Sequence, residues 1–113
     1  MTIFYKNQGY NLTTTNLTTT LNINTSTVAI IKEIAVANDD NSAHKVDYFF
    51  TDVSTSTSYK FYHTNVPADS HDNAVHNALV LEEGDYLQFQ ADTANVISGQ
   101  ISYALLTRSG ENG

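Results

Sequence analysis

The stretch Ile101-Ser102-Tyr103-Ala104-Leu105-Leu106-Thr107 closes the clearest structural signal in this sequence, a strand-like pattern that begins near Thr27. Short runs rich in Val, Ile, Phe, Tyr and Thr alternate there with clusters of Asn, Asp, Ser and Gly. Turn signals at intervals of about 8–12 residues between such runs are typical of antiparallel β domains, and no segment has a convincing helical period. We therefore expect an all-β fold, an antiparallel β-sandwich of Greek-key or jelly-roll topology with seven or eight strands.

Alternation of apolar and polar residues within these runs predicts the core, because successive side chains of a strand point to opposite faces. The run Val28–Ala37 is interrupted by Lys32, which favours either a strand buried on both faces for part of its length or a bulge near Lys32 and Glu33. Pro67 should end a strand, and Gly84 should adopt a left-handed conformation in a tight turn. The predicted core comprises Ile30 or Ile31, Ile34, Val36, Val46, Tyr48, Phe50, Leu81, Leu87, Phe89, Ile101, Tyr103 and Leu105.

The first 25 residues follow a different pattern. Asn11-Leu12-Thr13-Thr14-Thr15 is repeated at once over residues 16–20. Residues 17–23 are predicted to form a strand, with Leu17, Leu21 and Ile23 on one face. We expect residues 1–16 to form an extended N-terminal arm, residues 17–108 the sandwich domain and residues 109–113 a C-terminal tail.

The expected arm carries apolar side chains and few charges: Ile3, Phe4, Tyr5, Tyr10 and Leu12. A segment this short cannot bury that surface against itself. One hypothesis is that these five residues contact another subunit, for instance by adding a strand to a neighbouring sheet edge. The alternative is a poorly ordered terminus.

Length and charge limit the classes of function. The 113 residues suffice for one sandwich core, and the chain has no cysteine for a disulfide or a thiolate metal site. No apolar run approaches the roughly 20 residues of a membrane span, and the N-terminus lacks the features of a secretion signal, so we expect synthesis in a cytoplasm. A formal charge of −7 argues against binding to nucleic acid and to anionic membranes.

No group of residues has the spacing of a catalytic or metal site. His71 and His76, with Asp69 and Asp72 nearby, do not match the spacing of zinc ligands. Asn38–Asn41 and the acidic run Glu82-Glu83-Gly84-Asp85 are explained as turns, and no nucleophile or phosphate-binding motif is present. We therefore expect no catalytic residue, no cofactor and no metal. The seven tyrosines and five phenylalanines leave a sugar-stacking surface, as in carbohydrate-binding modules, as an alternative.

Three segments carry a resemblance to a known class of proteins: Val28–Asn38 (VAIIKEIAVAN), Leu79–Leu87 (LVLEEGDYL) and Ile97–Tyr103 (ISGQISY). Their order and spacing resemble small β-sandwich virion proteins of tailed bacteriophages, particularly phages of marine and cyanobacterial hosts. The resemblance covers about residues 26–107, and its motifs are structural rather than catalytic. The doubled Asn-Leu-Thr-Thr-Thr is not part of it.

The resemblance implies a non-enzymatic subunit of a virus particle that is made in the host cytoplasm. A capsid decoration (cement) protein is the first expectation, and a neck, tail or baseplate subunit is the alternative. Its partners would then be the major capsid protein or neck and tail subunits, and the chain would form a homo-oligomer.

Overall fold

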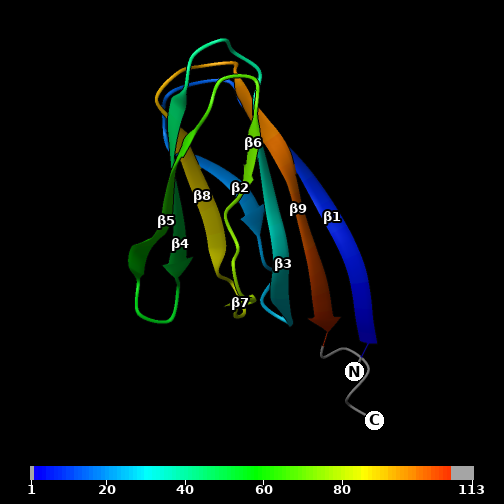
Figure 1. Ribbon diagram of the computed structural model, residues 1–113. Helices are drawn as coiled ribbons and strands as arrows, with labels where there is room; N and C mark the ends of the chain where they lie inside the picture. Colours follow the sequence, from blue (N-terminus) through cyan, green and yellow to red (C-terminus); the bar gives the residue numbers. More distant parts are fainter. Residues whose placement is uncertain (1, 108–113) are drawn as a thin grey trace.

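The computed structural model describes residues 2–107, which form nine strands and no helix, so none of the described residues lies in a helix long and apolar enough to cross a membrane. Two antiparallel sheets pack face to face (Figure 1). The fold is thus the predicted all-β sandwich. The strands are β1 (Thr2–Leu12), β2 (Thr18–Asn22), β3 (Thr27–Asn38), β4 (His44–Asp52), β5 (Thr57–Val66), β6 (His71–Asn73), β7 (Leu79–Leu81), β8 (Tyr86–Ala91) and β9 (Ile97–Thr107).

The strand order is that of a jelly roll, one of the two predicted topologies. The first sheet has the order β1-β9-β3-β6, with β7 also paired to β3, and the second has the order β2-β8-β4-β5. The chain pairs as nested hairpins, with β4 on β5, β3 on β6 and β7, β2 on β8, and β1 on β9. This nested ribbon closes on itself where β9 pairs with β3 and β8 with β4.

The structure has nine strands instead of seven or eight because one edge strand is broken. β6 pairs with β3 at Ala35–Ala37, whereas β7 pairs with β3 at Ala29–Ile31. Between them the side-chain oxygen of Asn73 accepts hydrogen bonds from the N–H groups of Ile34 (3.1 Å) and Val75 (3.0 Å). The side chain therefore replaces part of the ladder where the edge strand is interrupted.

The predicted core is confirmed. Ten of its twelve positions are buried, and of the two alternatives Ile30 and Ile31 it is Ile31 that is buried. The other two positions, Phe50 and Leu105, are partly buried and pack against the core. Prediction from alternation missed several residues, most of them near strand ends or in loops. The additional buried residues of the core cluster are Leu12, Leu21, Ile23, Ala29, Val66, Ala74, Val75, Ala91 and Ile97.

Two bulges change which side chains face the core. The register between β3 and β9 shifts between Ile31 and Glu33, which confirms the predicted bulge near Lys32 and places Ile30 on the outer face. A second shift in β2 lies between Thr19 and Leu21. The prediction that Leu17 shares a face with Leu21 is therefore wrong, and Leu17 is 43% exposed.

The predicted turn residues occupy the expected positions. Gly84 has a φ of +85° between β7 and β8, and its N–H donates to the carbonyl of Ile23 at 3.0 Å. β5 ends at Val66, directly before Pro67.

The N-terminal segment differs most from expectation. Residues 2–12 are β1, an edge strand that pairs with β9 of the same chain, rather than an arm that extends away from the sandwich. Thr2 lies opposite Thr107 and Leu12 opposite Ile97. The predicted tail at 109–113 lies outside the described residues.

Candidate functional site

The surface of interest is the β1 edge, by which we mean the side of Thr2–Leu12 that faces away from β9. On its inner side β1 pairs with β9 through eleven consecutive residue pairs without a register shift. Within residues 2–107 no strand pairs with its other side, and β1 runs along the flank of the molecule (Figure 1). Every residue from Thr2 to Gly9 is exposed. The backbone groups of this edge are therefore open to pairing.

The structure separates the five predicted contact residues into two groups. Ile3, Phe4 and Tyr5 are exposed, at 54%, 47% and 79% of their surface. Leu12 is buried in the core, and the ring of Tyr10 packs edge-on against Phe89 with 5.1 Å between centroids. Tyr10 and Leu12 thus hold β1 to its own sandwich, and Leu12, at 1% exposed, has almost no surface left for contact with another subunit.

Tyr10 reaches across a neighbouring strand. Its hydroxyl donates a hydrogen bond to the carbonyl oxygen of Ala35 in β3 at 2.7 Å, although β9 lies between β1 and β3. The crossing is possible because Gly99 of β9 lies opposite Tyr10. A Cβ at Gly99 would lie 1.9 Å from the Ala35 oxygen and 2.8 Å from the Tyr10 hydroxyl. Burial raises the pKa of Tyr10, so the hydroxyl stays protonated and able to donate.

The outer face of the first sheet is apolar beside the exposed end of β1. Register places Ile3 beside Leu106 and Val28, and Tyr5 in a row with Ala104, Ile30 and Val80. We call this set the outer patch. Ile3, Tyr5 and Val80 are exposed, whereas Ala104 is buried and the others are partly buried. Contiguous apolar surface on a sheet face is characteristic of contact sites.

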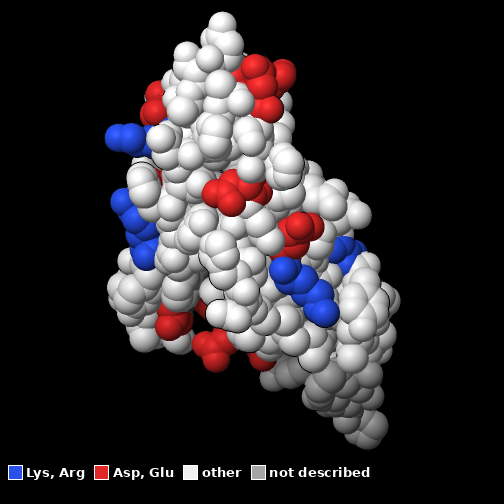
Figure 2. All heavy atoms as spheres, in the orientation of Figure 1, with Lys and Arg blue, Asp and Glu red and all other residues white. Residues whose placement is uncertain are grey.

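Charge is unevenly distributed along the chain. All twelve Asp and Glu residues follow Lys32, and Lys6 is the one charged residue of β1. Figure 2 shows acidic side chains at the top, in the middle and at the bottom of this face, including one right of the centre. The β1 edge is thus nearly uncharged in a strongly acidic protein.

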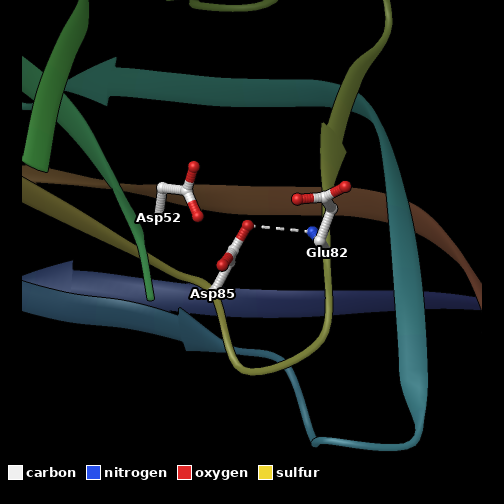
Figure 3. A group of neighbouring side chains, drawn as sticks. All are labelled: Asp52, Glu82 and Asp85. Atoms are coloured by element: carbon white, nitrogen blue, oxygen red, sulfur yellow. Dashed lines mark hydrogen bonds between the residues drawn. The ribbon is translucent and has the colours of Figure 1, made fainter. Parts of the chain in front are cut away.

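An acidic cluster lies where the β4–β5 and β7–β8 turns meet. Asp52, Glu82 and Asp85 have carboxylate oxygens within 4.8 Å of one another (Figure 3). The two oxygens of the buried Asp85 accept hydrogen bonds from the N–H groups of Val53 (3.1 Å) and Glu82 (3.0 Å). Asp52 accepts from the N–H and hydroxyl of Ser54. Asp85 therefore ties the β4–β5 turn to the β7–β8 turn, and these contacts account for its position.

His44 links two loops, a contact that we call the His44 clamp. This contact was not predicted from the sequence. The Nε2 of His44 lies 2.7 Å from Asp40 and its Nδ1 lies 2.9 Å from Asp92, and the ring is 12% exposed. The bond with Asp40 raises the pKa of His44, although partial burial works in the opposite direction. In return, the bond with His44 holds the pKa of Asp40 below its ordinary value. The clamp joins the segments before β4 and after β8.

The remaining candidate residues stay apart. Within residues 2–107, Asp52, Glu82 and Asp85 are the one group with the geometry to share an ion, and it includes neither His71 nor His76. His76 contacts the hydroxyl of Tyr62 at 2.8 Å, and His63 contacts Asp47 at 2.6 Å. Each of these contacts joins one histidine to one neighbouring side chain. The described histidines do not converge on one pocket.

The exposed aromatic residues do not form a sugar-stacking platform. Among the described residues, Phe4, Tyr5 and Tyr59 are the exposed large aromatic side chains. Phe4 and Tyr5 are adjacent in one strand and point to opposite faces, while Tyr59 belongs to β5 in the other sheet. A flat array of rings on one face, which carbohydrate stacking requires, is not formed by these three.

Known protein structures share the fold of this chain. No protein-family model matches the chain, and no curated protein matches it by sequence. A chain of the acid-stable capsid of Helicobacter pylori bacteriophage KHP30 superposes with a TM-score of 0.58 at 9% identity, with 96% of this chain and 90% of that chain covered. A chain of the Bacillus endospore appendages, which are disulfide-linked pili, superposes with a TM-score of 0.53 at 14% identity, covering 94% and 88%. At these identities the likeness concerns the fold alone.

Proposed function

We propose that this chain is a non-enzymatic structural subunit of a bacteriophage particle, and that it serves as a capsid decoration protein. The observation that carries the proposal is an uncharged, open strand edge with an apolar patch beside it, on a fold that a phage capsid chain shares. The chain would be made in the host cytoplasm and act in the virion.

The extent of the fold likeness supports this choice. The alignment covers 96% of this chain and 90% of the KHP30 capsid chain, so the two are nearly equal in length and no large domain is left over. The endospore pili share the fold, but they are described as disulfide-linked. None of the 113 residues here is a cysteine that could form such a bond, which favours the capsid comparison over the pilus comparison.

The distribution of apolar surface indicates how such a subunit would attach. On one sheet face, more than half of the surface of each of Ile3, Tyr5 and Val80 is exposed. Burying apolar surface in a protein contact lowers the free energy by roughly 25 cal/mol per Å². The outer patch is therefore the surface that we expect to meet other virion proteins, with Ile3 and Tyr5 shared between the patch and the β1 edge.

The first test is whether the chain travels with particles. Phage particles from the source of this sequence are banded in a density gradient, and the chain is quantified against the major capsid protein by mass spectrometry. A decoration protein should be present in a copy number comparable to that of the capsid lattice. A few copies per particle would favour the neck, tail or baseplate alternative, and recovery solely from the soluble fraction would contradict a virion role.

A further inference from the structure

The β1 edge lacks the protection that the other sheet edges have. Proteins protect edge strands with charges, prolines, bulges or short strands. β2 has five residues and a bulge, and the opposite edge of the first sheet is divided into two pieces of three residues. β5 is bulged at Phe61, where its register against β4 shifts, and it also carries Lys60. In contrast, β1 has eleven residues, regular pairing and one charge, Lys6.

We propose that two copies of this chain pair through their β1 edges, antiparallel about a two-fold axis at Asn7, to form one continuous sheet. This inference rests on the proposed function in that it names the subunit contact of that assembly. Identical strands that pair antiparallel form a self-complementary interface, which is the commonest arrangement of homodimers.

The pleat of the strand restricts the register. Directly opposed residues of an antiparallel pair lie on the same face, so the two-fold axis must pass through a residue position. An axis at Asn7 pairs the whole of β1, with Thr2 of one copy opposite Leu12 of the other. An axis one position away at Lys6 would place like charges opposite each other, which is destabilising.

The same register matches side chains of complementary size. On the outer face it places Tyr5 of each copy opposite Gly9 of the other. An added Cβ at Gly9 would have its nearest neighbour at 3.9 Å, the carbonyl oxygen of Gly99, so there is space beside this glycine. A cross-strand aromatic ring covers a strand glycine in this way. On the inner face Phe4, 47% exposed, lies opposite Tyr10 and gains an aromatic neighbour.

Charge favours this edge as the place where two acidic copies meet. A net charge of −7 on each copy produces mutual repulsion. In the first sheet, Glu33 lies in the row of Asn7 and Ser102, with β9 between it and β1. Two strand spacings place it roughly 10 Å from β1. Pairing through β1 therefore keeps the Glu33 carboxylates of the two copies far from each other. Added salt screens the remaining repulsion between the two acidic copies and should strengthen the dimer.

Single cysteines test the register, because the chain has none of its own. In the proposed dimer, the Asn7→Cys residues of the two copies lie about 4.5–5.5 Å apart between Cα atoms, within the range of a disulfide. Gly9→Cys is the matched control, because its two copies would lie about 13 Å apart along the strands. Under mild oxidation we expect Asn7→Cys to cross-link and Gly9→Cys to remain monomeric on a denaturing gel. Equal cross-linking of both variants, or of neither, would overturn the register.

Sedimentation of the purified chain tests the pairing itself. We expect the unmodified protein to sediment as a dimer at concentrations where Tyr5→Lys sediments as a monomer. Val80→Lys is the control, because Val80 lies in the same outer row but on β7, away from the β1 edge, and it should remain dimeric. A monomer at every concentration, or equal effects of the two lysines, would refute edge pairing. These measurements use no virus particles, so a negative result would refute the dimer and leave the virion role untouched. A failure to find the chain on particles would likewise leave the dimer untouched.

Discussion

Gly99→Ala is expected to be among the most damaging small substitutions in this protein. Its methyl group would lie 1.9 Å from the carbonyl oxygen of Ala35 and 2.8 Å from the Tyr10 hydroxyl. The carbonyl belongs to the central strand β3, so the clash cannot be relieved by turning a flexible side chain. Overpacking costs about 1–3 kcal/mol, and loss of the Tyr10 bond leaves a partly buried group unpaired at about 1–3 kcal/mol. The free energy of unfolding should therefore fall by about 2–6 kcal/mol.

Thermal unfolding followed by circular dichroism measures this effect. At about 4 °C per kcal/mol for a domain of this size, Tm should fall by at least about 8 °C. Gly9→Ala is the matched control, because its methyl group has no neighbour closer than 3.9 Å, and its Tm should stay within about 2 °C of the parent. If Gly99→Ala also stays within about 2 °C, the account of how Tyr10 crosses β9 is wrong.

Three further substitutions test other contacts. Gly84→Val should lower stability by about 1 kcal/mol or more, because φ is +85° there; an unchanged urea midpoint would exclude the left-handed turn. Asp85→Ala should cost at least about 2 kcal/mol, because two N–H groups lose their acceptor; a Tm equal to that of the parent would contradict this role. His44→Gln should lower Tm more at about pH 5.5 than at about pH 9. Because the pKa of His44 is raised above its unfolded value of 6.5, protonated His44 stabilises the fold below pH 6.5. That contribution is lost as the pH rises through the pKa of the folded state. Equal losses at both pH values would show that the charge of His44 does not contribute.

Local alternation was sufficient to predict most of the sandwich. Val46 and Tyr48 in β4, and Leu87 and Phe89 in β8, alternate with polar neighbours and are all buried, because each strand has one face on the core. The turn at Gly84 was predictable because glycine is tolerated at positive φ. These features depend on neighbours within a few residues.

The features that were missed depend on residues far apart in the chain. β1 pairs with β9 across the whole sequence, and nothing within residues 1–16 indicates that partner. The clamp on His44 uses Asp92, 48 residues later. The outer patch was missed because it combines residues of β1, β9, β3 and β7, which only the strand pairing brings together.

The candidate site was predictable in part. The scarcity of charge near Ile3, Phe4 and Tyr5 indicated a contact surface, and these residues are exposed. The same reasoning also included Tyr10 and Leu12, which pack against their own sandwich. Composition cannot distinguish an apolar residue that faces its own core from one that faces a partner. The decoration role and the resemblance to phages of marine and cyanobacterial hosts stay predictions.

An electron cryo-microscopy map of intact particles tests the proposed role most directly. The map should contain a two-sheet density of nine strands at repeated positions on the capsid lattice, with the outer patch against a neighbouring protein. Density for the chain at the neck or tail would refute decoration and retain a structural role. If no density on purified particles fits this sandwich, the chain is not a virion subunit and the central claim is wrong.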